Sequence, residues 1–338
     1  MTTTALTEPL APATPALPAR RALRLWSVVL AFIAVAIARS IQVGVPFRDP
    51  GGEFFVRRLI YSVALFAAYV VVDAAVRNRG FRGAGATIRA RWTRARLAAA
   101  AVALLAYDVT YVTYHNLKSW DAFNSPRDAM LERWDRWLFF GHSPAVLLHD
   151  LLGTGFAAHF LLGWYSTFGL LAIVAFPAVV ALARRTRDAY AGIASLIWVW
   201  ILGTATYYLI PSLGPFHVAP ADFASLPAMS VQKTQATYLA GRAQLLAHPS
   251  AHDSFAQVSA FASLHVGVTA TLLGIAWWNR LRRTTIALSV FLVGTMFATV
   301  YLGWHFAVDL PAGLAIAALA CVLGPLTVGV RERPAARR

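Results

Sequence analysis

Eight long apolar stretches limit what this 338-residue chain can fold into. Each has about 20 residues, the length at which an α-helix crosses the hydrocarbon core of a bilayer. The stretches cover approximately 23–44, 57–76, 96–114, 155–183, 190–211, 259–279, 284–302 and 304–330. The last two are separated by little more than Gly303, which predicts a tight helical hairpin. We therefore expect an all-α, polytopic membrane bundle of about eight transmembrane helices.

The composition argues against a soluble enzyme. Of all residues 58% are apolar and only 13% are charged, whereas soluble domains are nearer half apolar and a quarter charged. The single cysteine, Cys321, lies inside an apolar stretch, which excludes a disulfide framework and a cysteine-rich metal site.

The order of the stretches predicts four segments. Residues 1–19 are rich in Thr, Ala and Pro and are expected to form a disordered cytoplasmic tail. Residues 20–95 hold two spans and a basic cytoplasmic loop. The first span is long and lacks a clear small-residue cleavage site, so we expect it to be retained rather than removed as a signal peptide. Residues 96–330 form a six-helix core, and 331–338 form a basic cytoplasmic tail.

The basic residues predict the orientation. The net charge is +15, and two thirds of the 30 Lys and Arg residues fall in the N-terminal segment, alternate loops and the C-terminal tail. Cytoplasmic loops carry such an excess, so both termini are expected to be cytoplasmic. A nucleic-acid surface would need these charges on one folded face, and here they are scattered over five segments.

The histidines gather on the opposite side. All nine lie in the predicted outer loops or at the outer ends of spans: His115, His142, His149, His159, His217, His248, His252, His265 and His305. Longer and more polar outer loops account for most of them. They do not account for His265 and His305, which lie at span entrances within apolar sequence, where histidine is costly unless it has a function.

Two short motifs contain these two histidines. Phe261-Ala262-Ser263-Leu264-His265 opens the sixth span, and Trp304-His305-Phe306-Ala307-Val308-Asp309 opens the eighth. Positions i and i+4 share one face of a helix, so Asp309 is expected to hydrogen-bond His305 and to orient its ring. His265 would add a second imidazole from another helix, as acid–base or nucleophilic chemistry requires. One such pair alone could be structural; two motifs on the same side favour a functional site.

The two motifs resemble the second and third signature motifs of the type 2 phosphatidic acid phosphatase superfamily. The chain is most similar to the branch that contains fungal inositol phosphorylceramide synthase and its bacterial relatives, because it has SLH in the second motif and no arginine before His305. The resemblance covers approximately 110–330. It implies a lipid phosphatase- or phosphotransferase-like catalytic core over 96–330.

The resemblance also implies a role for each residue. His305 would attack phosphorus and form a phosphohistidine, and Asp309 would activate it. His265 would protonate the leaving oxygen and later activate the acceptor. Ser263 would help to hold the phosphate together with backbone N–H groups at the start of the sixth span. No metal and no other cofactor is implied.

The chain departs from the family pattern where positive charge is expected. No cation replaces the Lys and Arg-Pro of the first motif, and Thr299 stands in place of the third-motif arginine. A phosphate site needs such charge. Lys118 is the best replacement, because relatives carry a cation after the third span; Arg127 and Lys233 are weaker candidates, and each of the three could instead be an interfacial residue.

An integral membrane enzyme is therefore the leading hypothesis. It would act on a lipid-linked phosphate in the cell membrane, with its active site towards the outer face and with water or a sugar alcohol as acceptor. One alternative is a proton-coupled transporter that uses Asp108, Asp309 and the histidines, although no convincing internal repeat is present. A zinc hydrolase is another, although HExxH is absent. Residues 131–141 are amphipathic and are expected to lie at the membrane interface, with Trp134 and Trp137 at headgroup depth and no part in the chemistry.

Overall fold

A computed structural model describes residues 19–332, and every regular element in that part of the chain is a helix. The predicted tail over 1–19, apart from Ala19 at the start of α1, and most of the tail over 331–338 lie outside the described residues. The α-helices are α1 (Ala19–Val43), α2 (Val56–Arg77), α3 (Ala84–Arg91), α4 (Arg94–Trp120), α5 (Asp128–Leu138), α6 (Pro144–Leu152), α7 (Phe156–Leu182), α8 (Thr186–Leu209), α9 (Pro215–Val218), α10 (Ser230–Ala247), α11 (Leu264–Trp278), α12 (Arg282–Tyr301) and α13 (Asp309–Thr327). Short 3₁₀ turns lie at Pro50–Gly52, Asp121–Phe123 and Pro220–Phe223.

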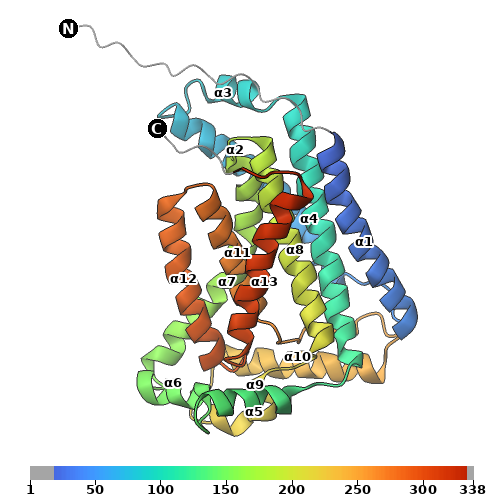
Figure 1. Ribbon diagram of the computed structural model, residues 1–338, viewed down its shortest axis with the longest axis vertical. Coiled ribbons are helices and arrows are strands. Elements are labelled where there is room, and N and C mark those ends of the chain that lie inside the picture. The colour runs from blue at the N-terminus through green and yellow to red at the C-terminus, as the bar shows by residue number, and fades with distance from the viewer. Residues whose placement is uncertain (1–18, 333–338) are drawn as a thin grey trace, which may run out of the picture.

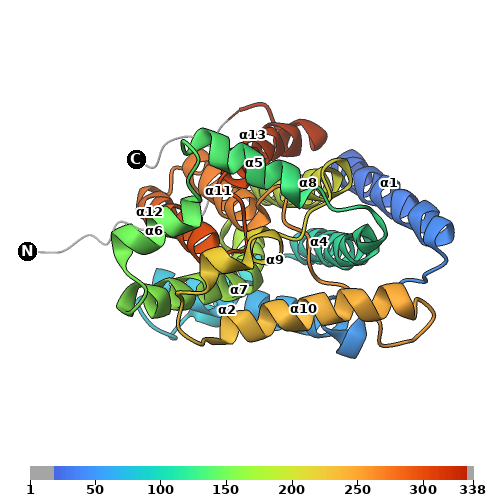
Figure 2. The same ribbon diagram turned by 90° about the horizontal axis from the view of Figure 1, so that it is seen from below.

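The long apolar helices run together along one axis, and helices that lie across this axis close one end of the bundle (Figure 1). Helices α5, α6, α9 and α10 lie across the lower end, and Figure 2 shows them from below. Helix α3 lies at the opposite end, where α1 begins and α13 finishes. The predicted all-α membrane bundle is confirmed.

Seven of these helices are long and apolar enough to cross a membrane, one fewer than the sequence predicted. The exception is the predicted span over 259–279. Its helix, α11, has 15 residues and begins only after Ser263, because residues 259–263 are not helical. A helix of that length rises only about 22 Å, short of the ~30 Å hydrocarbon core.

Helix α8 forms the centre of the bundle. In its most apolar window 72% of the residues are buried, against 22% for α1 and 17% for α2. Small residues let α13 approach α8 closely; Gly324, for example, packs directly against Ser195. Helices α1 and α2 therefore pack on the outside of the bundle, and α4 and α7 separate them from its centre.

Glycines also bring the starts of α11 and α13 together. A side chain at Gly313 would lie 2.5 Å from the carbonyl oxygen of Ser263, and one at Gly267 would lie 3.2 Å from Ile316. The backbone N–H of Ser263 donates to the carbonyl of Asp309 at 3.2 Å. This close approach places the two histidine motifs at one point of the fold.

Candidate active site

His265 and His305 lie side by side, as the two motifs predict. The Nδ1 atom of His265 is 3.0 Å from Nε2 of His305. On its other side, the Nδ1 atom of His305 is 3.0 Å from Oδ2 of Asp309. His305 is 4% exposed and Asp309 is fully buried, so water does not compete strongly for these contacts.

The partner of each nitrogen fixes where the protons are. A carboxylate only accepts hydrogen bonds, so Nδ1 of His305 donates to Asp309 and its Nε2 carries a lone pair. Nδ1 of His265 then donates to that Nε2. The arrangement prepares Nε2 of His305 to act as a nucleophile, with a protonated nitrogen next to it.

The pair of His305 and Asp309 forms through a turn, not along a helical face as the spacing predicted. Helix α12 ends at Tyr301 and α13 begins at Asp309, so seven residues separate the two helices. The backbone N–H groups of Trp304 and His305 both donate to the carbonyl of Thr299. Oδ2 of Asp309 also accepts from the backbone N–H of Phe306 at 3.1 Å, which closes the turn around the imidazole.

Ser263 immediately precedes α11 as its N-cap residue and is fully buried. Its hydroxyl caps the helix by accepting from the N–H of Val266 at 3.4 Å. Ser263 does not line the cavity described below, so its predicted contact with phosphate stays a prediction. His265 comes two residues later, in the first turn of the helix.

A cavity of about 210 Å³ opens beside the two histidines. Tyrosine, tryptophan and phenylalanine side chains form nearly half of its wall. Among the described residues that line it, Lys118 is the one lysine or arginine. Arg127 and Lys233 are exposed and do not reach the cavity. Of the three cations that the sequence offered for the phosphate site, Lys118 is therefore the one that borders the cavity.

His115 is a cavity residue that the sequence did not single out. It stacks on Phe54, with ring centroids 4.0 Å apart, and neither of its ring nitrogens has a hydrogen-bond partner among the described residues. It lies one helical turn before Lys118 on α4. This i, i+3 spacing is the sequence feature that could have placed His115 on the same face as Lys118.

Two buried carboxylates of α5 contact the loops of the site. Asp135 accepts from the backbone N–H groups of Ala307 and Val308 at 2.7 and 2.9 Å. Asp128 accepts from those of Leu213 and Gly214 at 2.8 and 2.9 Å. Burial raises the pKa of Asp135 to about 6, although the two N–H donors oppose the shift. Burial also raises the pKa of Asp128. The sequence placed this helix at the interface and gave it no chemistry.

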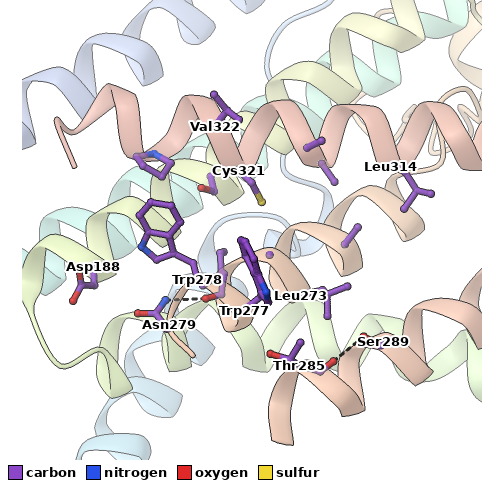
Figure 3. A pocket seen from close by; sticks show the side chains of 18 residues that line it. Asp188, Leu273, Trp277, Trp278, Asn279, Thr285, Ser289, Leu314, Cys321 and Val322 are labelled. Carbon is purple, nitrogen blue, oxygen red and sulfur yellow. Dashed lines mark hydrogen bonds between the residues drawn. The ribbon is translucent and has the colours of Figure 1, made fainter. Parts of the chain in front are cut away.

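A second cavity, of about 530 Å³, is lined by α8, α11, α12 and α13 (Figure 3). Its wall contains Trp277, Trp278 and Cys321 with a few polar groups, and it has no histidine. Asp108 bonds other residues than the histidines. It accepts a hydrogen bond from the hydroxyl of Ser62 at 3.0 Å and forms an ion pair with Arg58 at 3.8 Å. Within residues 19–332, no three His, Cys, Asp or Glu side chains are grouped as a metal site requires.

Comparison with known proteins identifies the family. The family model of the PAP2 superfamily matches residues 129–323, which is more than half of the chain. The chain belongs to the PAP2 superfamily. The match includes α5 apart from its first residue, Asp128, and both histidine motifs, and it lies inside the core predicted over 96–330. No curated protein matches significantly, and no solved structure does. Membership of the PAP2 superfamily, together with the apolar helices, fits a membrane phosphatase or phosphotransferase.

Proposed function

We propose that this protein removes or transfers the phosphoryl group of a lipid-linked phosphate through a phosphohistidine on His305. The observation that carries the proposal is the chain of contacts from Asp309 through His305 to His265, two steps of 3.0 Å each. Three groups arranged in this way can supply an orienting carboxylate, a nucleophile and an acid.

The first half-reaction follows from the proton positions. Nε2 of His305 attacks phosphorus while Asp309 stabilises the positive charge that develops on the ring. The bond from phosphorus to the lipid oxygen breaks, and His265, protonated on both ring nitrogens in the complex with the anionic substrate, gives that oxygen one proton and becomes neutral. Phosphate must enter between the two imidazoles, so their mutual hydrogen bond is replaced by bonds to the substrate.

The second half-reaction reverses these roles. His265, now neutral, takes the proton of the acceptor hydroxyl, and the acceptor oxygen attacks the phosphohistidine. His305 leaves with its lone pair on Nε2. Water as acceptor gives hydrolysis, and a sugar alcohol gives transfer. The likeness of SLH and of the arginine-free third motif to the inositol phosphorylceramide synthase branch supports transfer.

The cavity supports a substrate whose head group alone is enclosed. Its volume of about 210 Å³ is too small for acyl chains, which would stay in the bilayer beside the apolar helices. Lys118 would offset charge on the phosphoryl oxygens, and the unpartnered nitrogens of His115 could bond the head group or the acceptor. We further propose that this end of the bundle faces outward in the cell membrane, as the charge asymmetry predicts.

Acid-quenched labelling tests the mechanism. Purified protein is mixed with a ³²P-labelled lipid phosphate, and protein-bound label and turnover are measured in detergent. We expect acid-labile label in the unmodified protein and neither label nor turnover in His305→Ala. His265→Ala should regain turnover with an aryl phosphate, whose good leaving group needs little protonation, but not with the lipid. Full label in His305→Ala would exclude the phosphohistidine at this position.

A further inference from the structure

The contacts of helix α5 go beyond those of a helix that only lies at the interface. Its inward face carries Asp128, Leu131 and Asp135, spaced so that all three lie on one side. Both aspartates are more than nine-tenths buried, and Leu131 is fully buried between them. The opposite face carries Trp134 and Trp137, which are 44% and 79% exposed. Buried carboxylates need hydrogen-bond donors, and backbone N–H groups in the two loops of the site supply them.

Asp135 holds the turn that carries the nucleophile. Its two oxygens each accept one backbone N–H, from Ala307 and Val308, at 2.7 and 2.9 Å. These residues lie between His305 and Asp309, so the carboxylate fixes the segment that joins the two partners of the catalytic pair. Without it, the N–H groups of Ala307 and Val308 would lack this acceptor, and the segment would be free to shift.

Asp128 holds the loop that supports the other motif. Its Oδ1 accepts the N–H groups of Leu213 and Gly214 at 2.8 and 2.9 Å. Next to them, Ser212 receives the N–H of Ala260 on its carbonyl and that of Phe261 on its hydroxyl, at 2.9 and 2.8 Å. Residues 260–262 lead directly into the segment that carries His265.

The two loops also contact each other. Gly214 has a φ of +114°, and a side chain there would lie 2.9 Å from the carbonyl oxygen of Trp304. The N–H of Phe216 donates to the carbonyl of Gly303 at 3.1 Å. One helix thus secures two loops that meet at the site, each through one carboxylate.

We infer that α5 sets the spacing of the two histidines: Asp135 is a positioning residue for His305, and Asp128 is a positioning residue for His265. Neither aspartate lines the cavity, so neither touches the substrate. The catalytic part of this inference rests on the proposed phosphoryl transfer. Its structural part does not.

Hydrogen exchange tests the structural part without any assay of activity. Asp135→Asn conserves shape but presents an amide N–H₂ to one of the two backbone donors. Oδ1 of Asp128 alone accepts both of its bonds, so Asp128→Ala is used to remove them. We expect faster exchange at 302–309 in Asp135→Asn and at 211–216 in Asp128→Ala. Helix α8 should keep its protection in both, which shows that the variants fold. Glu132→Gln is the matched control, because Glu132 bonds Arg136 on the same helix and no loop of the site. Unchanged exchange at both loops would overturn the inference.

Turnover tests the catalytic part. A displaced nucleophile slows every substrate, so Asp135→Asn should lower kcat by about 10–100-fold for lipid and aryl phosphates alike, with little change in KM. A displaced acid matters less for a good leaving group, so Asp128→Ala should lower kcat for the lipid at least tenfold more than for the aryl phosphate. Partial unfolding would lower both equally. If Asp135→Asn does not fold, Asp128→Ala carries the test alone. Two variants as active as Glu132→Gln would overturn the inference, whereas inactivity of the unmodified protein would instead reject the proposed function.

Discussion

Asp309 is the residue on which the reactivity of His305 depends most directly. Its Oδ2 accepts both from the ring Nδ1 of His305 and from the N–H of Phe306, while Oδ1 has no hydrogen-bond partner among the described residues. Its negative charge is therefore directed at one imidazole. Such a carboxylate fixes the tautomer and stabilises the imidazolium formed in the reaction.

Replacement of Asp309 by Asn should slow the reaction strongly and leave the fold intact. The amide oxygen can still accept from Nδ1, but it cannot balance a positive ring, so we expect kcat to fall by about 10³–10⁴. The double variant with His305→Ala should be no worse than His305→Ala alone, since the residues act as one unit. Steady-state turnover of the three variants measures this. An additive loss in the double variant would mean that the two side chains act separately.

Lys118 is the cation that the cavity makes available to a phosphoryl group. Lys118→Ala removes one stabilising charge, so we expect a loss of about 10²–10³ in kcat. Arg127→Ala is the matched control, because Arg127 is exposed away from the cavity, and it should keep its turnover within about twofold. The opposite result, with Lys118→Ala active and Arg127→Ala inactive, would place the phosphate elsewhere.

At the scale of elements, α5 connects the exposed Trp134 and Trp137 with the two loops of the site. Because it buries two carboxylates, the stability of the protein is expected to depend on pH. Burial raises the pKa of Asp135 from an ordinary value of 3.8 to about 6, and the nearby Asp309 and Glu132 contribute in the same direction. The folded state therefore binds this proton more tightly than the unfolded state does.

The stabilising contribution of that proton should be complete below about pH 4 and lost as the pH rises through about 6. Asp135→Asn cannot titrate. The difference in the free energy of unfolding between the unmodified protein and Asp135→Asn should consequently favour the unmodified protein most near pH 4. This difference should shrink towards pH 7, by at most about 1.4 kcal/mol per unit of pKa shift, and Tm should follow it. Thermal unfolding in detergent at several pH values measures it, with Asp150→Asn, an exposed carboxylate on α6, as control. A difference that stays constant with pH would contradict the raised pKa.

Across the whole molecule, charge and architecture agree on two distinct ends. The short helices α5, α6, α9 and α10 cover the end where the histidine motifs meet, and α3 with its neighbouring arginines lies at the other. Both the first and the last described helix reach the α3 end. The positive-charge bias predicts that this end is cytoplasmic.

Cysteine labelling tests that orientation. In a Cys321→Ala parent, new cysteines at the exposed positions Ser125 and His252 should react with an impermeant maleimide added to intact cells. A cysteine at the exposed Ala86, on α3, should react only after the membrane is opened. Labelling of position 86 from outside would reverse the bundle and move the site to the cytoplasmic face.

The sequence by itself determined the class of fold and the residues of the candidate site. Apolar length and the distribution of arginines are read along the chain, because a bilayer acts on each span separately. His265, His305 and Asp309 could be named in the same way, since histidine and aspartate in apolar sequence need a partner or a function. The shortness of α11 was missed, because apolar composition does not reveal where Ser263 caps the helix.

Only the tertiary structure decided how these groups meet. His305 reaches Asp309 through a turn, Lys118 rather than Arg127 borders the cavity, and α5 bonds the loop at Ala307 from 172 positions away. Local periodicity extends over a few residues, so it cannot show which distant backbone N–H a buried carboxylate will satisfy. In the sequence, Asp135 is one of several charges on an amphipathic helix. The tertiary structure shows that it is buried, and a buried carboxylate needs hydrogen-bond donors.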